Sequence, residues 1–206
     1  MKKAIVFVDV QNDFVKGGAL PFGYPAEDNV SKIVEFAKEC ADAYCNDSTN
    51  HVRIYATRDT HEATKFIYHF EGDKRIDEPE SGYLATLEGQ KLPVEHCAEG
   101  TEGWQIVDSL MDVIVGKCTF INKPTFGSYD LAEVICEDFG ANGPDEIIIC
   151  GYCTSICVLS NAVLLRAKYP DVKIIVRADL CGDVDKEAFD AAVKVLKMQM
   201  IDVESK

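Results

Sequence analysis

The sequence lacks any apolar run long enough to cross a membrane. A transmembrane helix needs about 18 consecutive apolar residues, and the first apolar run, AIVFVDV at residues 4–10, already contains an aspartate. Lysines precede this run, as in a secretory leader, but no small-residue cleavage site follows it. We therefore interpret the segment as a first strand and predict a cytoplasmic protein.

Basic residues are also in short supply. The chain has 21 Lys and Arg against 35 Asp and Glu, which gives a formal net charge of −14. Nucleic acids and anionic membranes attract proteins that present basic patches. The acidic balance therefore predicts no nucleic-acid partner and no membrane partner, although it does not identify a substrate.

The chain lacks the paired CxxC motifs of a zinc ribbon, although cysteine itself is abundant. Nine cysteines are present, and the single CxxC, CGYC at residues 150–153, has no second pair at zinc-site spacing. The stretch CGYCTSICVLSNA, residues 150–162, places three cysteines in eight positions. Buried thiols, a redox dithiol of Cys150 and Cys153, and an exposed nucleophile are all compatible with this density.

Internal repeats, low-complexity segments and linkers are absent, so we expect one domain over residues 1–206. Apolar runs typical of buried parallel strands alternate with segments of helical period. This alternation predicts an α/β fold in three layers, with a central, mostly parallel sheet and helices on both faces. The predicted strands are residues 4–10, 52–58, 146–151 and 172–178, with 112–117 and 119–123 as further candidates, and the predicted helices are residues 29–46, 129–140, 155–169 and 186–200.

The region between residues 60 and 104 follows neither period. It is charged and punctuated by glycine and proline. We expect a loop-rich insertion around residues 62–84, because EGDKRIDEPESG, residues 71–82, is typical of a solvated loop. Loops of this length inside a compact domain are usually functional or mobile.

Polar residues follow several of the predicted strands. Asp9 follows the first strand, Asp59 and His61 follow the second, and Lys123 ends the segment TFINK. The cysteine stretch follows the strand EIIICG. Ligands bind at the carboxyl ends of parallel strands in open α/β sheets, so we expect these residues to gather at one edge of the sheet.

Each of these residues also has an ordinary structural interpretation. Asp9 fits a loop carboxylate or a helix cap as well as a buried acid or base, and Lys123 fits a surface lysine, with Lys117 as a local rival. Cys157 opens an apolar helix, where unpaired N–H groups and the helix dipole favour a thiolate and could hold an oxyanion. Cys150 fits the core of its strand.

Five sequence blocks, taken together, resemble the isochorismatase-like cysteine hydrolases, the family that includes nicotinamidases and pyrazinamidases. The blocks are VFVDVQNDF (6–14), RDTH (58–61), PVEHCAEGTEGW (93–104), NKPTFGSYD (122–130) and GYCTSICVLSNA (151–162). They follow the family's order from the first strand to the last third of the chain.

The resemblance implies that Asp9, Lys123 and Cys157 form a catalytic triad for amide hydrolysis. Free cysteine has a pKa of about 8.5, so its thiol is mostly protonated at neutral pH. A carboxylate can take the proton, and a nearby ammonium can hold the carboxylate and the developing charge. The expected reaction converts nicotinamide to nicotinate and ammonia through a cysteine thioester.

The resemblance also implies a cis peptide bond between Tyr152 and Cys153. The backbone amides of Cys153 and Cys157 would then form the oxyanion hole. Phe14, the aromatic residue of the D-x-Q-x-D-F block, and Tyr152 are the residues that the resemblance assigns to substrate binding.

Nicotinamidases hold a divalent metal beside the triad, and the resemblance places its ligands at Asp59, His61 and His96. The remaining protein ligand has two candidates, Glu88 and His69, of which Glu88 fits a family variant with a glutamate shortly before the final histidine. Carboxylate and imidazole ligands suit Zn, Fe or Mn. We therefore expect one divalent ion as the cofactor.

The chain departs from the family at a position that bears on the substrate. Nicotinamidases often have a tryptophan three positions before the last histidine ligand, where this chain has Pro93. The only tryptophan, Trp104, has a structural role as its alternative. Tyr68, Phe70 or Tyr83 from the insertion could instead cover the site as a lid.

Other functions stay open at this point. The chain could be a cysteine hydrolase of the same fold that acts on an N-carbamoyl or ureide compound, although no metal site is expected there. It could also be a catalytically silent binding protein. The expected partner is a small-molecule amide, and the family suggests a homo-oligomer.

Overall fold

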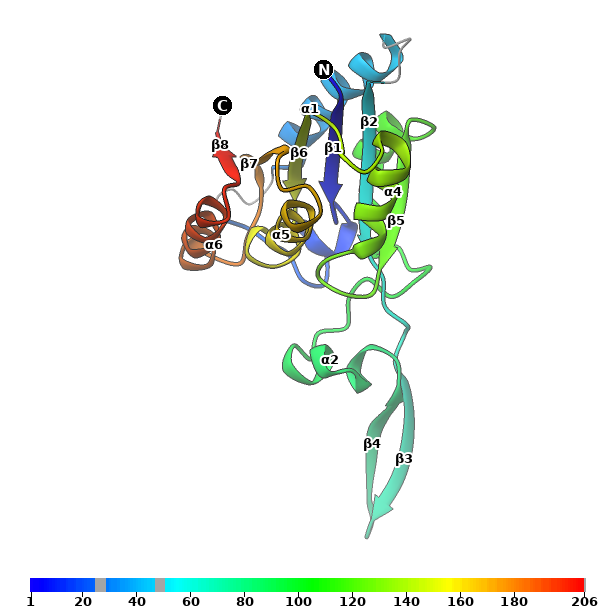
Figure 1. The fold of residues 1–206 in the computed structure, drawn as a ribbon. Coiled ribbons are helices and arrows are strands. Elements are labelled where there is room, and N and C mark those ends of the chain that lie inside the picture. The colour runs from blue at the N-terminus through cyan, green and yellow to red at the C-terminus, as the bar shows by residue number, and fades with distance from the viewer. Residues whose placement is uncertain (25–28, 47–50, 206) are drawn as a thin grey trace.

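The computed structural model describes residues 1–24, 29–46 and 51–205, and its centre is a six-stranded sheet (Figure 1). The strand order is β5-β2-β1-β6-β7-β8, and every neighbouring pair is parallel. The strands are β1 (Lys3–Val8), β2 (Val52–Asp59), β5 (Cys118–Lys123), β6 (Glu146–Gly151), β7 (Lys173–Cys181) and β8 (Asp202–Glu204).

The inner strands are apolar on both sides because both of their faces are covered. In β1, every residue from Ala4 to Val8 is buried, and Ile147 and Ile149 of the neighbouring β6 are fully inaccessible to solvent. Continuous apolar runs of this kind are typical of parallel sheets between helical layers. They are also the reason that these strands could be predicted closely.

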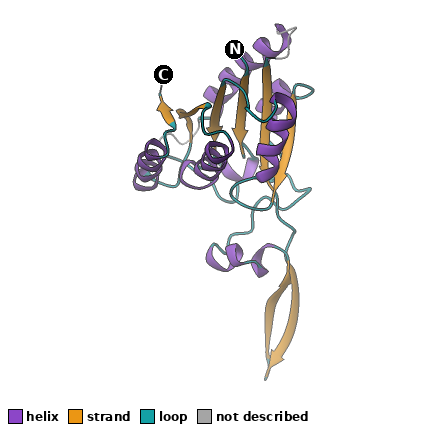
Figure 2. Ribbon diagram, viewed as in Figure 1, coloured by secondary structure: helices purple, strands orange, loops and turns teal. Residues whose placement is uncertain are grey.

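Helices cover both faces of the sheet (Figures 1 and 2). On one face lie α1 (Val30–Asn46) and α3 (Asp108–Ile114), and on the other lie α4 (Tyr129–Phe139), α5 (Leu159–Lys168) and α6 (Lys186–Met198). Side-chain caps fix two of the helix starts: Ser128 accepts a hydrogen bond from the Leu131 N–H, and Asp185 accepts one from the Ala188 N–H. The predicted three-layer α/β fold is therefore confirmed.

Two elements differ from the prediction. Residues 112–117 were a candidate strand, but residues 108–114 form α3. Leu110 and Ile114, four residues apart, are both fully buried, so a helical period places them on the same side. The edge strand β8 was not predicted, because it is only three residues long and two of these are exposed.

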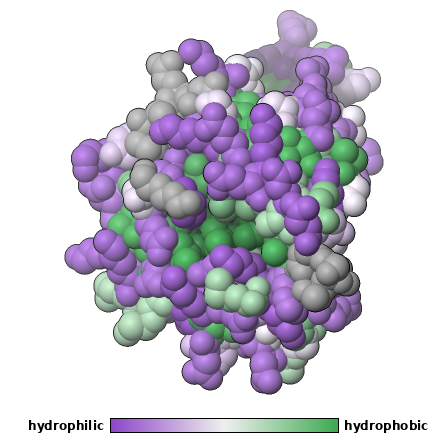
Figure 3. Space-filling view, turned by 90° about the horizontal axis from the view of Figure 1, so that it is seen from above, coloured by the Kyte–Doolittle hydropathy of each residue, from purple (hydrophilic) through white to green (hydrophobic). Residues whose placement is uncertain are grey.

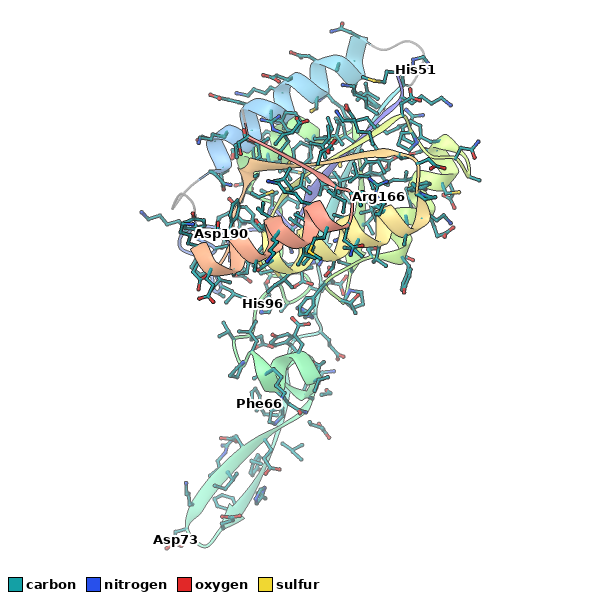
Figure 4. The ribbon with its side chains drawn as sticks, turned by 60° about the vertical axis from the view of Figure 1, so that its left-hand side comes forward. His51, Phe66, Asp73, His96, Arg166 and Asp190 are labelled. Atoms are coloured by element: carbon teal, nitrogen blue, oxygen red, sulfur yellow. The ribbon has the colours of Figure 1, made fainter. Side chains whose placement is uncertain are left out.

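The insertion is a β-hairpin rather than a loop-rich segment. Strands β3 (Lys65–Glu71) and β4 (Lys74–Ser81) pair antiparallel, and the hairpin extends away from the body of the molecule, with Asp73 at its tip (Figure 4). The chain returns through the short helices η2 (Tyr83–Ala85) and α2 (Leu87–Lys91). The prediction failed because almost every residue of the hairpin is exposed, so no buried face imposes an alternating pattern.

The surface is largely hydrophilic. Figure 3 looks onto the amino ends of the strands and shows apolar residues in a hollow surrounded by hydrophilic ones. Among the described residues, no helix is both long and apolar enough to span a membrane.

Candidate active site

Asp9 lies immediately after β1 and is fully buried. Its backbone has a φ of 50°, which turns the chain away from the sheet. The Thr57 hydroxyl donates to Asp9 Oδ1 at 2.6 Å. Apart from an ion pair with Lys123, Oδ2 has no hydrogen-bond partner among the described residues. This oxygen is thus placed to exchange a proton with a bound molecule.

Lys123 ends β5 and is only 1% exposed. Its Nζ lies 2.7 Å from Asp9 Oδ2, 3.4 Å from Asp59 Oδ1 and 3.5 Å from Cys157 Sγ. Burial lowers the pKa of Lys123, but the charges of Asp9, Cys157 and Asp59 outweigh burial and raise the pKa well above its ordinary value. The interpretation of Lys123 as a surface lysine is therefore wrong.

Cys157 lies in η3 (Thr154–Val158), a π-helical turn that leads directly into α5. The preceding strand β6 ends at Gly151, where an added Cβ would lie 2.0 Å from the Val8 carbonyl oxygen. Only glycine permits this close approach of the two strand ends. The peptide bond between Tyr152 and Cys153 is cis, as predicted.

The thiol of Cys157 is protonated at rest. Burial raises its pKa well above the ordinary value; the Lys123 ammonium opposes this shift, and Asp9 adds to it. The expectation that the helix start favours a resting thiolate is thus wrong. A base must take the proton before the sulfur can attack, and Asp9 is a carboxylate held on the same lysine.

The amides next to the thiol leave a donor available. The N–H of Thr154 donates to the Gly182 carbonyl, and those of Ile156 and Val158 donate to the Cys153 carbonyl. The N–H of Cys153 itself has no acceptor within the described parts of the chain. A buried amide without a partner costs free energy unless a ligand accepts from it.

Four further side chains converge beside the triad. Ligand atoms of Asp59, His61, Glu88 and His96 all lie within 4.8 Å of one another. His61 Nε2 is 2.9 Å and His96 Nε2 is 3.4 Å from Asp59 Oδ2, and each is 3.9 Å from Glu88 Oε1. Two imidazoles and two carboxylates at these separations fit a divalent transition metal.

The surroundings of the cluster orient its imidazoles. The Val94 carbonyl lies 2.7 Å from His96 Nδ1, which favours a proton on Nδ1 and leaves Nε2 as the ligand atom. Tyr83 is 1% exposed, and its ring centroid lies 4.6 Å from that of His61 and 4.8 Å from that of His96. The alternative ligand His69 lies in β3, half-exposed, outside this group.

Asp59 joins the triad to the four-residue cluster. One of its oxygens faces Lys123 and the other faces the two histidines. Burial raises the pKa of Asp59, but Lys123 and the hydrogen bonds from His61 and His96 overcome it and hold the pKa well below its usual range. The carboxylate is therefore ionised and available as a metal ligand.

Three supporting residues were missed from the sequence. The Gln11 amide bonds both the N–H and the carbonyl of Asp59, at 2.7 and 2.9 Å, and so fixes the end of β2. Asp13 accepts from the Cys97 N–H at 2.7 Å, and Thr57 holds Asp9. Gln11 and Asp13 stand in the D-x-Q-x-D-F block, which was a usable signal, whereas nothing local singles out Thr57.

A cavity of about 210 Å³ opens onto the two clusters. Cys157, Asp59, Glu88 and His96 lie at its polar end, together with Cys153. The other lining residues are apolar: Phe14, Leu20, Pro21, Phe22, Leu92, Phe126, Ile156 and Val184. This volume suits a small, flat molecule with one polar group.

The structure places the predicted aromatic contacts differently. Phe14 lines the cavity and packs 5.5 Å from the His96 ring. Tyr152 is absent from the described lining, and its hydroxyl donates to Asn29 instead. Trp104 has the structural role: its indole N–H donates to Thr60, and the Arg58 guanidinium lies 4.1 Å from its ring.

The insertion contributes one aromatic residue to the site. Tyr83 packs on the histidines, but Tyr68 and Phe70 lie exposed on the hairpin. A lid formed by Tyr68 or Phe70 is therefore not the arrangement in this structure.

A second hollow, of about 310 Å³, lies at the amino ends of the strands. Its charged residues pair with one another: Lys3 and Lys173 both contact Glu146, at 3.1 and 3.3 Å. None of the predicted site residues lines it, so the carboxyl end of the sheet is the candidate site.

Known proteins resemble this chain over most of its length. The nicotinamidase of Saccharomyces cerevisiae is 28% identical over 182 residues, which cover 78% of this chain and 80% of the yeast protein. The nicotinamidase/pyrazinamidase of Mycobacterium tuberculosis is 24% identical over 208 residues, which cover 98% of this chain and 97% of that protein.

Solved structures share the fold. The nicotinamidase/pyrazinamidase of Bacillus subtilis matches with a TM-score of 0.73 at 22% identity, over 98% of this chain and 99% of that one. The pyrazinamidase of Pyrococcus horikoshii in complex with zinc matches with a TM-score of 0.70 at 21% identity, over 100% of both chains. The isochorismatase domain model matches residues 3–205, and the chain therefore belongs to the isochorismatase family of hydrolases, as the five sequence blocks predicted.

Proposed function

We propose that this protein is a metal-assisted, nicotinamidase-like amidohydrolase that converts nicotinamide to nicotinate and ammonia. The observation that carries the proposal is the meeting of two clusters at one end of an apolar cavity. Asp9, Lys123 and Cys157 form the first, the four candidate metal ligands form the second, and Asp59 contacts both.

The first half of the reaction forms a thioester. Asp9 takes the proton of the Cys157 thiol, and the sulfur attacks the amide carbonyl carbon. The N–H groups of Cys153 and Cys157 hold the oxyanion, and Lys123 stabilises the negative charge on its neighbours. When the C–N bond breaks, Asp9 returns the proton to the leaving nitrogen, and ammonia departs.

The second half releases the acid. Asp9, ionised again, accepts a proton from water as the water oxygen attacks the thioester carbonyl. The C–S bond then breaks, and the proton passes from Asp9 to the sulfur. Nicotinate leaves, and Cys157 is again a neutral thiol, which is the resting state favoured by its burial.

Asp59, His61, Glu88 and His96 would hold one Zn, Fe or Mn ion. When bound, the ion supplies a Lewis acid that binds the pyridine nitrogen of the substrate. Glu88 is preferred over His69 because Glu88 lies in the cluster. The Pyrococcus horikoshii structure contains zinc, which supports zinc as the first metal to test.

The cavity walls favour an aromatic amide over a ureide. A ureide carries several N–H and C=O groups, each of which needs a hydrogen-bond partner when buried. The walls away from the two clusters are apolar, with Phe14, Phe22 and Phe126 among them. A pyridine ring can be buried there without loss of hydrogen bonds, although Pro93 replaces the family's usual tryptophan.

The test compares nicotinamide, benzamide and an N-carbamoyl amino acid as substrates of the zinc-loaded enzyme. Benzamide has the same shape as nicotinamide but lacks the ring nitrogen. We expect kcat/KM to be higher for nicotinamide than for benzamide by roughly a hundredfold, and the difference to shrink in His96→Ala. Faster turnover of the N-carbamoyl compound would overturn the proposed substrate and leave the nucleophile in place.

A further inference from the structure

The hairpin of β3 and β4 carries exposed apolar residues that neither the fold nor the active site uses. Phe66, Ile67, Tyr68 and Phe70 are between 47% and 63% exposed. The hairpin stands clear of the body of the molecule, with Phe66 near its base and Asp73 at its tip (Figure 4). An isolated two-stranded hairpin is at best marginally stable in water, so a partner surface would stabilise it.

The two edges of this hairpin differ in their capacity to accept another strand. The turn consists of Gly72 and Asp73, so Glu71 and Lys74 form its closing pair. In a two-residue hairpin the closing pair is hydrogen-bonded, and alternate residues direct their N–H and C=O groups outward. On β4 the outward positions include Pro79, which has no N–H group, so this edge is blocked.

The edge of β3 is open and complementary to itself. Its outward positions are Phe66, Tyr68 and Phe70, all of which have a backbone N–H group. The strand reads KFIYHFE from Lys65 to Glu71, with a basic residue at one end and an acidic residue at the other. If two copies align antiparallel about Tyr68, each Lys65 lies opposite a Glu71, and each Phe66 lies opposite a Phe70.

We propose that two copies of this chain pair through β3, antiparallel about Tyr68, and join their hairpins into one four-stranded sheet. The pairing is isologous, because the same strand contributes both sides of the contact. Like charges do not meet in this register, whereas pairing through β4 about Asp77 would place two aspartates opposite each other. The interface is independent of the proposed catalytic reaction.

A disulfide test reads the register directly. In a Cys45→Ser background, which removes an exposed cysteine, Tyr68→Cys places two thiols opposite each other with Cα atoms about 5.5 Å apart, within disulfide range. Phe66→Cys is the matched control, because its two copies would lie roughly 13 Å apart along the strands. We expect a disulfide-linked dimer only from Tyr68→Cys. Equal cross-linking of both variants, or of neither, would overturn the proposal.

A charge test reads the contribution of the same edge to association. By sedimentation velocity over a wide range of protein concentrations, we expect the native chain to dimerise. Tyr68→Lys places two cations opposite each other and should weaken the dimer roughly tenfold or more. Asp77→Lys changes the residue that faces Tyr68 across the hairpin and should leave the dimer intact. A native monomer at every concentration, or a dimer unaffected by Tyr68→Lys, would contradict the proposal.

Discussion

Lys123 is a buried cation with a buried anion on two sides. Its ammonium contacts both Asp9 and Asp59, and all three side chains are almost inaccessible to solvent. Removing one member of a buried ion pair is costly because the other charge is left without a partner. The catalytic arrangement is therefore also a determinant of stability.

Loss of Lys123 alone should destabilise the fold more than loss of the whole pair. We expect Lys123→Met to lower the free energy of unfolding by about 3–5 kcal/mol, because Asp9 keeps a buried charge. The double variant Asp9→Asn/Lys123→Met should recover most of this loss. Urea unfolding of both variants measures the difference, and a double variant less stable than Lys123→Met would contradict the argument.

Tyr83 should influence metal binding without being a ligand. Its ring packs on His61 and His96, and its hydroxyl donates to the Leu92 carbonyl. Tyr83→Leu removes the ring and should weaken metal binding by roughly tenfold. Tyr83→Phe keeps the ring and should bind metal nearly as the native chain does. A zinc titration of the apo-protein compares them; equal affinities for all three would argue against a positioning role.

Residues with direct chemical roles could be predicted from the sequence, whereas most of their supports could not. Asp9 and Lys123 each end an apolar run at the edge where ligands bind, and the motif blocks indicated which neighbours belong with them. Thr57 sits inside β2 and looks like any strand residue. Its bond to Asp9 depends on the register of two parallel strands, which no local pattern specifies.

At the scale of elements, the end of β6 is the most constrained point. The backbone of Gly151 has a φ of 121° and approaches the Val8 carbonyl. Neither the conformation nor the space admits a side chain. This crossing delivers the chain into the cis bond and then into η3, which carries Cys157.

Gly151→Ala should therefore destabilise the whole fold. We expect a loss of at least about 2 kcal/mol, because β1 and β6 must move apart to accommodate the methyl group. Gly23→Ala is the matched control, since nothing lies within 4 Å of a Cβ at that position. Thermal unfolding of the two variants tests this, and similar midpoints would show that the strand ends adapt freely.

Element prediction succeeded where burial imposes a pattern and failed where it does not. The strand EIIICG was predicted with its observed bounds, Glu146–Gly151, because five of its residues are buried. The hairpin has no core of its own and gave no such signal. For residues 112–117, a short apolar run fits a strand or a helix equally, and packing of Leu110 and Ile114 decides for α3.

At the scale of the whole molecule, buried thiols should limit stability in alkali. Burial raises the pKa of Cys153 and of Cys181 to about 12, whereas thiols of an unfolded chain ionise near pH 8.5. A raised folded-state pKa contributes stability that is complete below the unfolded pKa and is lost as pH rises toward the folded one. Each such thiol then costs about 1.4 kcal/mol per pH unit.

Urea unfolding between about pH 8 and pH 10 should show this loss. Cys181→Ala should make the pH dependence shallower, because one buried thiol no longer ionises on unfolding. Cys45→Ser, which changes an exposed cysteine, is the control and should leave the slope unchanged. A stability that does not fall over this range would contradict the assignment of neutral buried thiols.

The layered architecture could be predicted because alternating strands and helices leave few arrangements for a parallel sheet. The direction in which the hairpin extends and the convergence of Glu88 on the histidines could not, since both depend on how residues 62–96 fold back onto β2. His61, for example, is tied to this segment through the backbone of Cys97 and Glu99.

The most direct measurement is ammonia release from nicotinamide by the purified chain, compared in zinc-loaded enzyme, chelated enzyme and Cys157→Ala. The account predicts turnover by the loaded enzyme, a large loss on chelation that added zinc restores, and none above background from a folded Cys157→Ala. Equal turnover by Cys157→Ala, or no turnover by the folded and loaded native chain, would contradict it.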